Sequence, residues 1–130
     1  MTTQRIFRGD DAERQFAFCQ VVRRGDQIFA SGMTGRGDDG QIVHPTDAYQ
    51  QALQALNNLA GYLKEAGANM ADVVRTRIYL VRQQDVADVS RAHREVFEDY
   101  PPAATLLFVA GLFSPEILVE IEADVVIGAE

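Results

Sequence analysis

The chain has 130 residues, which is long enough for one domain with a hydrophobic core and too short for two, so we expect a single domain over residues 1–130. With 19 acidic and 12 basic residues the net charge is -7, which repels phosphate backbones and disfavours nucleic acid as a partner. One cysteine excludes an internal disulfide, and a polar start without a long apolar segment predicts a cytoplasmic protein with no membrane partner.

The first third of the chain predicts a β-hairpin and a loop. After a polar lead at residues 1–15, the apolar run at residues 16–22 predicts a strand, and a second strand follows at residues 27–32. Residues 23–26, Arg-Arg-Gly-Asp, supply the turn between them. Residues 33–40 are rich in glycine and aspartate and predict a flexible loop, because a phosphate-binding loop would need a lysine or an oriented helix start.

The middle of the chain predicts a helix and a strand. Pro45-Thr46-Asp47 opens the helix, and Gly67 is placed to end it. The apolar residues of this helix recur at three- and four-residue steps, at Tyr49, Ala52, Leu53, Leu56, Leu59, Ala60 and Leu63. A strand follows at residues 73–81, and one of its faces carries Arg75, Arg77 and Tyr79.

A second helix and two further strands are predicted for the remainder. Residues 85–100 form a helical pattern that Pro101-Pro102 stops, with an apolar face made of Val86, Val89, His93, Val96 and Phe97. That position predicts a packed, hydrogen-bonded His93 rather than a metal ligand. Residues 101–126 predict two strands joined by a tight connection at residues 114–116.

The last of these strands alternates with a period of two. Its apolar side chains point one way, and its acids point the other way: Glu120, Glu122 and Asp124. If the strand at residues 73–81 is its neighbour, Arg75 and Arg77 neutralise part of this acidic row. Glu122 and Asp124 are then structural, whereas Glu120 is either paired with an arginine such as Arg77 or a functional carboxylate.

The element order predicts the fold class. The order is strand, strand, helix, strand, helix, strand, strand. It indicates an α+β fold in which two helices cover one face of a mostly antiparallel sheet. We expect the uncovered face to carry the arginine and acid rows together with Ala104, Leu106 and Phe108. Such a face is too apolar to be left wet, so it predicts self-association.

Several stretches together resemble the YjgF-like or Rid family, the reactive intermediate deaminases. They are Phe18-Cys19-Gln20, residues 28–32 (IFASG), residues 74–80 (VRTRIYL), Pro102-Ala103 and residues 119–123 (VEIEA). The match covers nearly the whole chain from about Phe16. The resemblance implies a chorismate-mutase-like fold, a homotrimer whose sheets form a central barrel, small-molecule clefts between subunits, and neither a metal nor an organic cofactor.

The resemblance also implies roles for particular residues. Deaminases of this family hold a substrate carboxylate with an arginine, and they use a glutamate and hydroxyl groups to position the water that attacks an imine carbon. Carried onto this sequence, the catalytic pair is Glu120 and Thr105. The ligand-binding set is Phe18, Ser31, Gly32, Ser90, Ala104 and Leu106.

This sequence departs from the family pattern at the anchor. Ala104 stands where the family has its arginine, Phe18 where it has a tyrosine, and Met33 where a glutamine is common. The usual carboxylate anchor is therefore missing, and Arg75 or Arg77 could supply a cation from another strand.

Two functions are consistent with this pattern. One is an enamine or imine deaminase-type hydrolase acting on a small metabolite other than the usual 2-imino acids. The other is a non-catalytic trimer that binds a small molecule for regulation. A ribonuclease role is disfavoured by the acidic charge and the lack of stacking aromatic residues.

Overall fold

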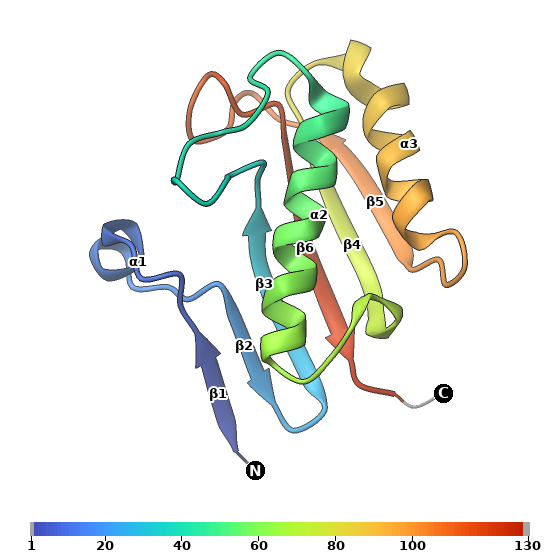
Figure 1. Ribbon diagram of the computed structural model, residues 1–130. Coiled ribbons are helices and arrows are strands. Elements are labelled where there is room, and N and C mark those ends of the chain that lie inside the picture. The colour runs from blue at the N-terminus through green and yellow to red at the C-terminus, as the bar shows by residue number, and fades with distance from the viewer. Residues whose placement is uncertain (1, 129–130) are drawn as a thin grey trace.

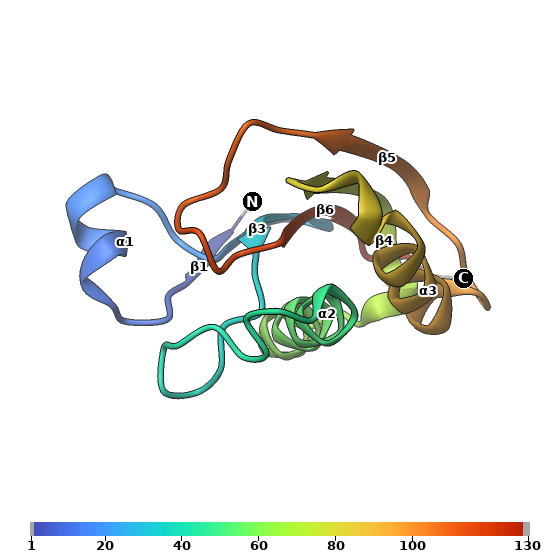
Figure 2. The same cartoon turned by 90° about the horizontal axis from the view of Figure 1, so that it is seen from above.

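The computed structural model describes residues 2–128, which form one six-stranded sheet with two long helices on one of its faces (Figures 1 and 2). The strands are β1 (Thr3–Ile6), β2 (Val21–Arg24), β3 (Gln27–Met33), β4 (Val73–Leu80), β5 (Ala103–Phe108) and β6 (Val119–Val126). The helices are α1 (Asp11–Phe16), α2 (Ala48–Glu65) and α3 (Val86–Phe97), with short 3₁₀ turns at Met70–Asp72 and Gln83–Asp85.

The sheet has the strand order β1-β2-β3-β6-β4-β5, and every neighbouring pair is antiparallel except β4 and β5. The predicted mostly antiparallel sheet with two helices on one face is therefore confirmed, with one parallel pair added. α2 and α3 both lie on the concave side of the curved sheet in Figure 2. Among the described residues, no helix combines the length and apolar character that crossing a bilayer requires.

The tight connection predicted at residues 114–116 is wrong. β5 does not pair with β6; it runs parallel to β4 at the edge of the sheet, and residues 109–118 form a long connection back to the centre. A parallel strand needs a crossover, and α3 provides it between β4 and β5. Proline at residue 115 marked a break in the ladder, but the break is a loop rather than a hairpin turn.

The strand predicted at residues 16–22 begins only at Val21, because the polar lead is structured. It forms β1 and α1, and α1 starts with a capping box in which Asp10 and Glu13 bond to each other's backbone N–H groups. Ala17, in the left-handed conformation with φ 62°, ends the helix. The hairpin itself is confirmed as β2 and β3.

The core lies between the sheet and α2. The apolar row of β6 is buried as predicted, and it packs with the inner face of α2, whose buried members include Ala52, Leu56, Leu59 and Leu63. Asp47 caps α2 and Gly67, with φ 90°, follows its end, as expected. His93 on α3 is half-buried and shares a 2.9 Å hydrogen bond with the buried Thr76 of β4, which confirms a packed histidine.

The face of the sheet away from the helices, called here the open face, carries the predicted charge rows. β4 lies beside β6 in the register Arg77 to Glu122 and Tyr79 to Glu120. The Nη1 atom of Arg77 lies 3.3 Å from Oδ2 of Asp124 and 3.6 Å from Oε1 of Glu122. Neutralisation of part of the acidic row is therefore confirmed for Arg77, whereas among residues 2–128 Arg75 forms no ion pair with the row and Glu120 is left unpaired.

The apolar residues of β5 were assigned to the wrong face. Ala104 and Leu106 are level with Thr76 and Ile78 of β4, whose side chains are buried toward the helices. Neighbouring residues of paired strands point to the same side, so Ala104, Leu106 and Phe108 belong to the helix-covered face. The open face receives Ala103, Thr105 and Leu107 instead. The wrong face was assigned because β5 was assumed to form a hairpin with the last strand, whereas its actual neighbour is β4.

Candidate functional site

A cavity of about 240 Å³ opens next to Glu120, where β3 and β6 meet the N-terminal segment. Glu120 and three residues of the expected ligand-binding set line it together, namely Phe18, Ser31 and Gly32. They come from β6, from the segment after α1 and from β3, so the fold joins positions that are far apart in the sequence. We call this the Glu120 cavity.

Gly32 makes room for the Glu120 carboxylate. The register between β3 and β6 shifts between Ala30 and Met33, so the strand is irregular at this point. A Cβ atom at residue 32 would overlap the carboxylate of Glu120, and only glycine allows this carboxylate to lie across β3. Ser31, beside it, donates its hydroxyl proton to the carbonyl oxygen of Cys19 at 2.7 Å, which orients its lone pairs.

Glu120 is half-buried, and its surroundings disfavour the charged form. Burial, followed by the negative charge of Glu122, raises the pKa of the Glu120 carboxyl above its ordinary value of 4.5. Arg77, the arginine expected as its partner, binds Glu122 and Asp124 instead, and the hydroxyl of Tyr79 donates to Glu122. Within residues 2–128 no hydrogen bond or ion pair engages its carboxylate. An unpaired carboxylate with a raised pKa beside a cavity is suited to taking up and returning a proton.

The other expected site residues lie elsewhere in the same chain. Ser90, Ala104, Thr105 and Leu106 line a second cavity, of about 240 Å³, between β5 and α3. We call it the β5 cavity. The two cavities share no lining residue, so a single chain does not bring Thr105 to Glu120.

Arg8 belongs to the Glu120 cavity and was missed because it lies in the polar lead. The buried Glu13 fixes this segment: its carboxylate accepts the backbone N–H groups of Arg8 and Gly9, each at 2.7 Å, and the side-chain amide of Gln20 at 2.9 Å. Burial alone would raise the pKa of Glu13, but these hydrogen bonds outweigh it and lower the pKa. The Asp10 to Glu13 capping box is the sequence signal that could have revealed this turn.

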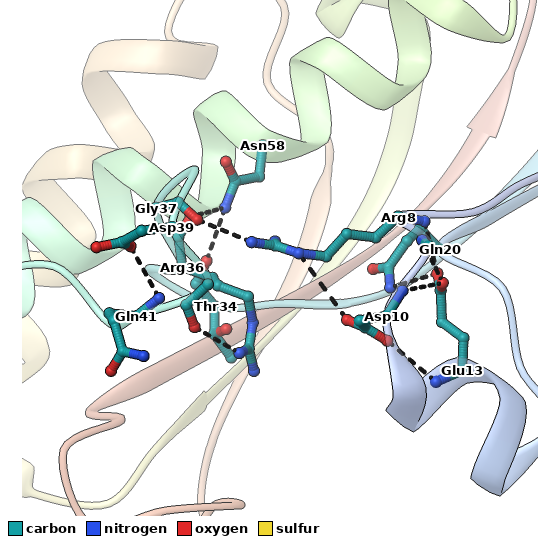
Figure 3. Close-up of polar contacts among 12 residues, drawn as sticks. Arg8, Asp10, Glu13, Gln20, Thr34, Arg36, Gly37, Asp39, Gln41 and Asn58 are labelled. Carbon is teal, nitrogen blue, oxygen red and sulfur yellow. Dashed lines mark hydrogen bonds and ion pairs between the residues drawn. The ribbon is translucent and has the colours of Figure 1, made fainter.

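Arg36 also lines the Glu120 cavity, from the loop that was predicted to be flexible. The side-chain amide of Asn58 on α2 donates to the carbonyl oxygens of Thr34 and Arg36 at 3.1 and 2.8 Å (Figure 3). Arg8 Nη2 donates to the carbonyl oxygen of Gly37 at 2.8 Å, which ties the N-terminal segment to the same loop. The loop is thus held at several points.

The arginines proposed from the sequence as replacements for the family anchor do not reach this cavity. Arg77 is engaged by two carboxylates on the open face, and neither it nor Arg75 lines the Glu120 cavity or the β5 cavity. In the described part of the chain no three His, Cys, Asp or Glu side chains are grouped so that they could hold a metal ion.

A curved sheet with two helices on one face, and a cavity at its irregular strand that a carboxylate lines, define a small α+β protein with a candidate site. A family model described as Endoribonuclease L-PSP matches residues 11–127, and the chain belongs to this family, which is also known as the YjgF or RidA family. The resemblance noted in the sequence is therefore confirmed.

Three relatives show how close the match is. The chain is 35% identical to a 2-iminobutanoate/2-iminopropanoate deaminase of Mus musculus, over 85% of this chain and 82% of that one. It is 33% identical to an uncharacterized protein of Streptomyces coelicolor, over 97% of this chain and 93% of that one. The crystal structure of a YjgF family member from Mycobacterium tuberculosis superposes with a TM-score of 0.87 at 32% identity, covering 97% of this chain and all (100%) of the other.

Proposed function

We propose that this chain is a hydrolase of the Rid type that adds water to the C=N bond of a small imine and releases ammonia. The observation that carries this proposal is the Glu120 carboxylate, half-buried, unpaired among the described residues and raised in pKa, on the wall of a small cavity. The printed name of the mouse relative, an iminobutanoate and iminopropanoate deaminase, supports the same reaction class.

The reaction needs one group that moves protons. Glu120 accepts a proton from water as the water oxygen bonds to the imine carbon, and the imine nitrogen takes up a proton from solvent, giving a carbinolamine. Glu120 then returns its proton to the departing nitrogen, the C–N bond breaks, and the hydroxyl group becomes a carbonyl by releasing its own proton to solvent. The balance is one imine and one water in, one carbonyl compound and one ammonia out, so no cofactor is required.

We further propose that a second copy of the chain completes the site, in a homotrimer in the cytoplasm. Ala104 and Thr105 are exposed on the edge strand β5, and the open face has no helix above it. If β5 of one copy approaches the Glu120 cavity of another, Ser90 adds a polar group, and Ala104 and Leu106 form an apolar wall. Thr105, whose side chain points to the opposite face of β5, can hold the attacking water through its backbone groups. This arrangement explains why one chain keeps the two halves apart.

The cavity size favours a substrate of a few carbon atoms. About 240 Å³ is below the roughly 300–1,000 Å³ typical of pockets for drug-sized ligands. A metabolite fits such a space, whereas an RNA chain would need an extended basic groove, and the net charge of -7 opposes one.

A non-catalytic binding trimer is the second candidate, and Phe18 and Ala104 favour it. They remove from the site the hydroxyl and the cation that the family's deaminases have. This alternative predicts a ligand that raises the melting temperature and is recovered chemically unchanged.

The test is ammonia release from a freshly generated short-chain imine, followed for the wild type, Glu120→Gln and buffer. We expect the wild type to exceed buffer and Glu120→Gln to lose at least about 100-fold. Glu98→Gln, an exposed glutamate at the end of α3, is the matched control and should retain wild-type activity. A wild-type rate equal to buffer for every imine tried would leave the binding function as the better account.

A further inference from the structure

We infer that the Glu120 cavity binds a ligand with a carboxylate group, and that Arg8 and Arg36 hold this group. The inference shares the cavity with the proposed hydrolase but does not require catalysis. It assigns the anchor to the N-terminal segment and to the loop after β3, whereas the sequence pattern placed the anchor on β5, where Ala104 now stands.

The positive charge of these two arginines is only weakly neutralised nearby. Arg8 donates to the neutral carbonyl oxygen of Gly37, and its Nε atom lies 3.9 Å from Oδ2 of Asp10, at the limit of an ion pair. Arg36 donates from Nη1 to the carbonyl oxygen of Gly40 at 2.9 Å, and within residues 2–128 it forms no ion pair. A guanidinium has five N–H donors, so each arginine keeps donors for a ligand.

Both arginines are held in place before any ligand arrives. The buried Glu13 fixes the backbone at Arg8, and Asn58 fixes the backbone at Arg36. The Arg8 bond to Gly37 joins the two segments across the cavity (Figure 3). Donors that are already ordered lose little entropy when they bind, so this geometry favours affinity for an anion.

The charges of the cavity favour a ligand with a negative end and a neutral end. Two cations, Arg8 and Arg36, share its wall with two carboxylates, Asp10 and Glu120. Asp10 lies 3.9 Å from Arg8, whereas within residues 2–128 no cation pairs with Glu120, and Arg36 forms no ion pair. An anion beside Glu120 would be repelled, whereas an anion on the arginines leaves the uncharged part of the ligand for Glu120. The planar fork of arginine matches the two oxygens of a carboxylate. A short monocarboxylate with a C=N or C=O group therefore satisfies both ends.

The experiment measures binding of 2-oxobutanoate, of its uncharged amide and of inorganic phosphate to the full chain by calorimetry. We expect saturable binding of the acid, weakened by added salt, and binding of the amide weaker by at least about tenfold. Arg8→Ala and Arg36→Ala should each lose at least about tenfold in affinity for the acid. Arg24→Ala, an exposed arginine of β2, is the matched control and should bind like the wild type.

Several results would overturn the inference: no saturable binding of either anion, an amide that binds as tightly as the acid, or unchanged affinity in both arginine variants. Phosphate binding that the same two variants lose would support an anion site and extend its chemistry to phosphate. If an alanine variant does not fold, Arg8→Lys and Arg36→Lys replace it, because lysine keeps the positive charge but lacks the planar fork of arginine. The difference in wild-type affinity between the acid and the amide tests the anion site in either case.

The inference and the proposed hydrolase fail differently. If Glu120→Gln binds 2-oxobutanoate and the wild type releases no ammonia, the anion site is supported and the hydrolase reaction is not. If both arginine variants release ammonia with an unchanged KM, the anion site is contradicted and the hydrolase is supported.

Discussion

Glu120 owes its character to its neighbours on the open face. Arg77 and the hydroxyl of Tyr79 bind Glu122 and Asp124, with 2.7 Å from Tyr79 to Oε1 of Glu122, so the cation nearest in the ladder is already occupied. Glu120 is left with a negative neighbour and a partly buried position, and both raise its pKa. A carboxylate of this kind lowers the stability of the fold while it prepares a site for proton transfer.

Glu120→Gln is therefore expected to stabilise the protein at neutral pH. Because the pKa of Glu120 is raised on folding, the folded chain binds its proton more tightly, and stability falls as pH rises from about 4.5 through the raised pKa. The neutral amide of glutamine does not ionise, so the variant does not lose stability as the pH rises. Its melting temperature at pH 7 should therefore exceed that of the wild type, while ammonia release disappears. Thermal unfolding at pH 4 and pH 7 checks it, and a variant less stable than the wild type at pH 7 would contradict the assignment.

Gly32→Ala tests the close approach of β3 and Glu120. The added methyl group overlaps the carboxylate, so the side chain of Glu120 must move, and we expect ammonia release to fall by at least about tenfold with some loss of stability. Gly61→Ala is the matched control, because a Cβ atom there meets nothing within 4 Å, and alanine inside α2 should add about 0.5–1 kcal/mol of stability. Normal activity in Gly32→Ala would show that the position of Glu120 does not matter.

At the scale of elements, the caps, the side-chain periods and the pairing of β4 with β6 were predicted correctly, whereas the place of β5 was not. Asp47, Gly67 and the alternation of β6 specify their elements from neighbouring residues, because caps and side-chain periods are local properties. β5 lies at the edge of the sheet because α3 carries the chain across from β4. The residues of β5 themselves give no signal of this crossover. A register taken from the wrong neighbour put Ala104 and Leu106 on the wrong face.

The candidate site divides in the same way. Phe18, Ser31, Gly32 and Glu120 were found through the family resemblance, and the fold brings them to one cavity. Arg8 and Arg36 were not, because Arg8 lies in a segment described only as a polar lead and Arg36 lies in a loop predicted to be flexible. Their positions depend on Glu13 and Asn58, which act through backbone groups far along the chain.

Gln51 connects α2 to the segment that leads into β6. This fully buried amide donates to the carbonyl oxygens of His44 and Glu116 at 3.1 and 2.8 Å and accepts the backbone N–H of Leu118 at 2.9 Å. Gln51→Leu leaves these three backbone groups without their partner, so we expect a loss of about 3 kcal/mol in the free energy of unfolding. Denaturant unfolding measures it, with Gln50→Leu as the control. A loss below about 0.5 kcal/mol would mean that water replaces the amide.

For the whole molecule, the composition of the open face favours assembly with other copies of the chain. Phe29, Leu107 and Val126 are each more than 40% exposed there, at 46%, 47% and 42%, on the same face as the ion pairs of Arg77 with Glu122 and Asp124. Exposed apolar side chains next to charges that are already paired suit a contact between copies of the same chain. A contact of this kind would also bring β5 of one copy near the Glu120 cavity of the next.

The central claim is that one site is built from Glu120 of one copy and from β5 of another, and mixed oligomers test it most directly. Glu120→Gln removes the proton carrier, and Ala104→Trp fills the apolar wall opposite it, so each variant alone should release no ammonia above buffer. Co-expressed in equal amounts, they should form intact sites wherever a Glu120 chain meets an Ala104 chain, restoring about one quarter of the wild-type rate. Full activity of Ala104→Trp alone, or no recovery in mixed oligomers, would contradict the shared site.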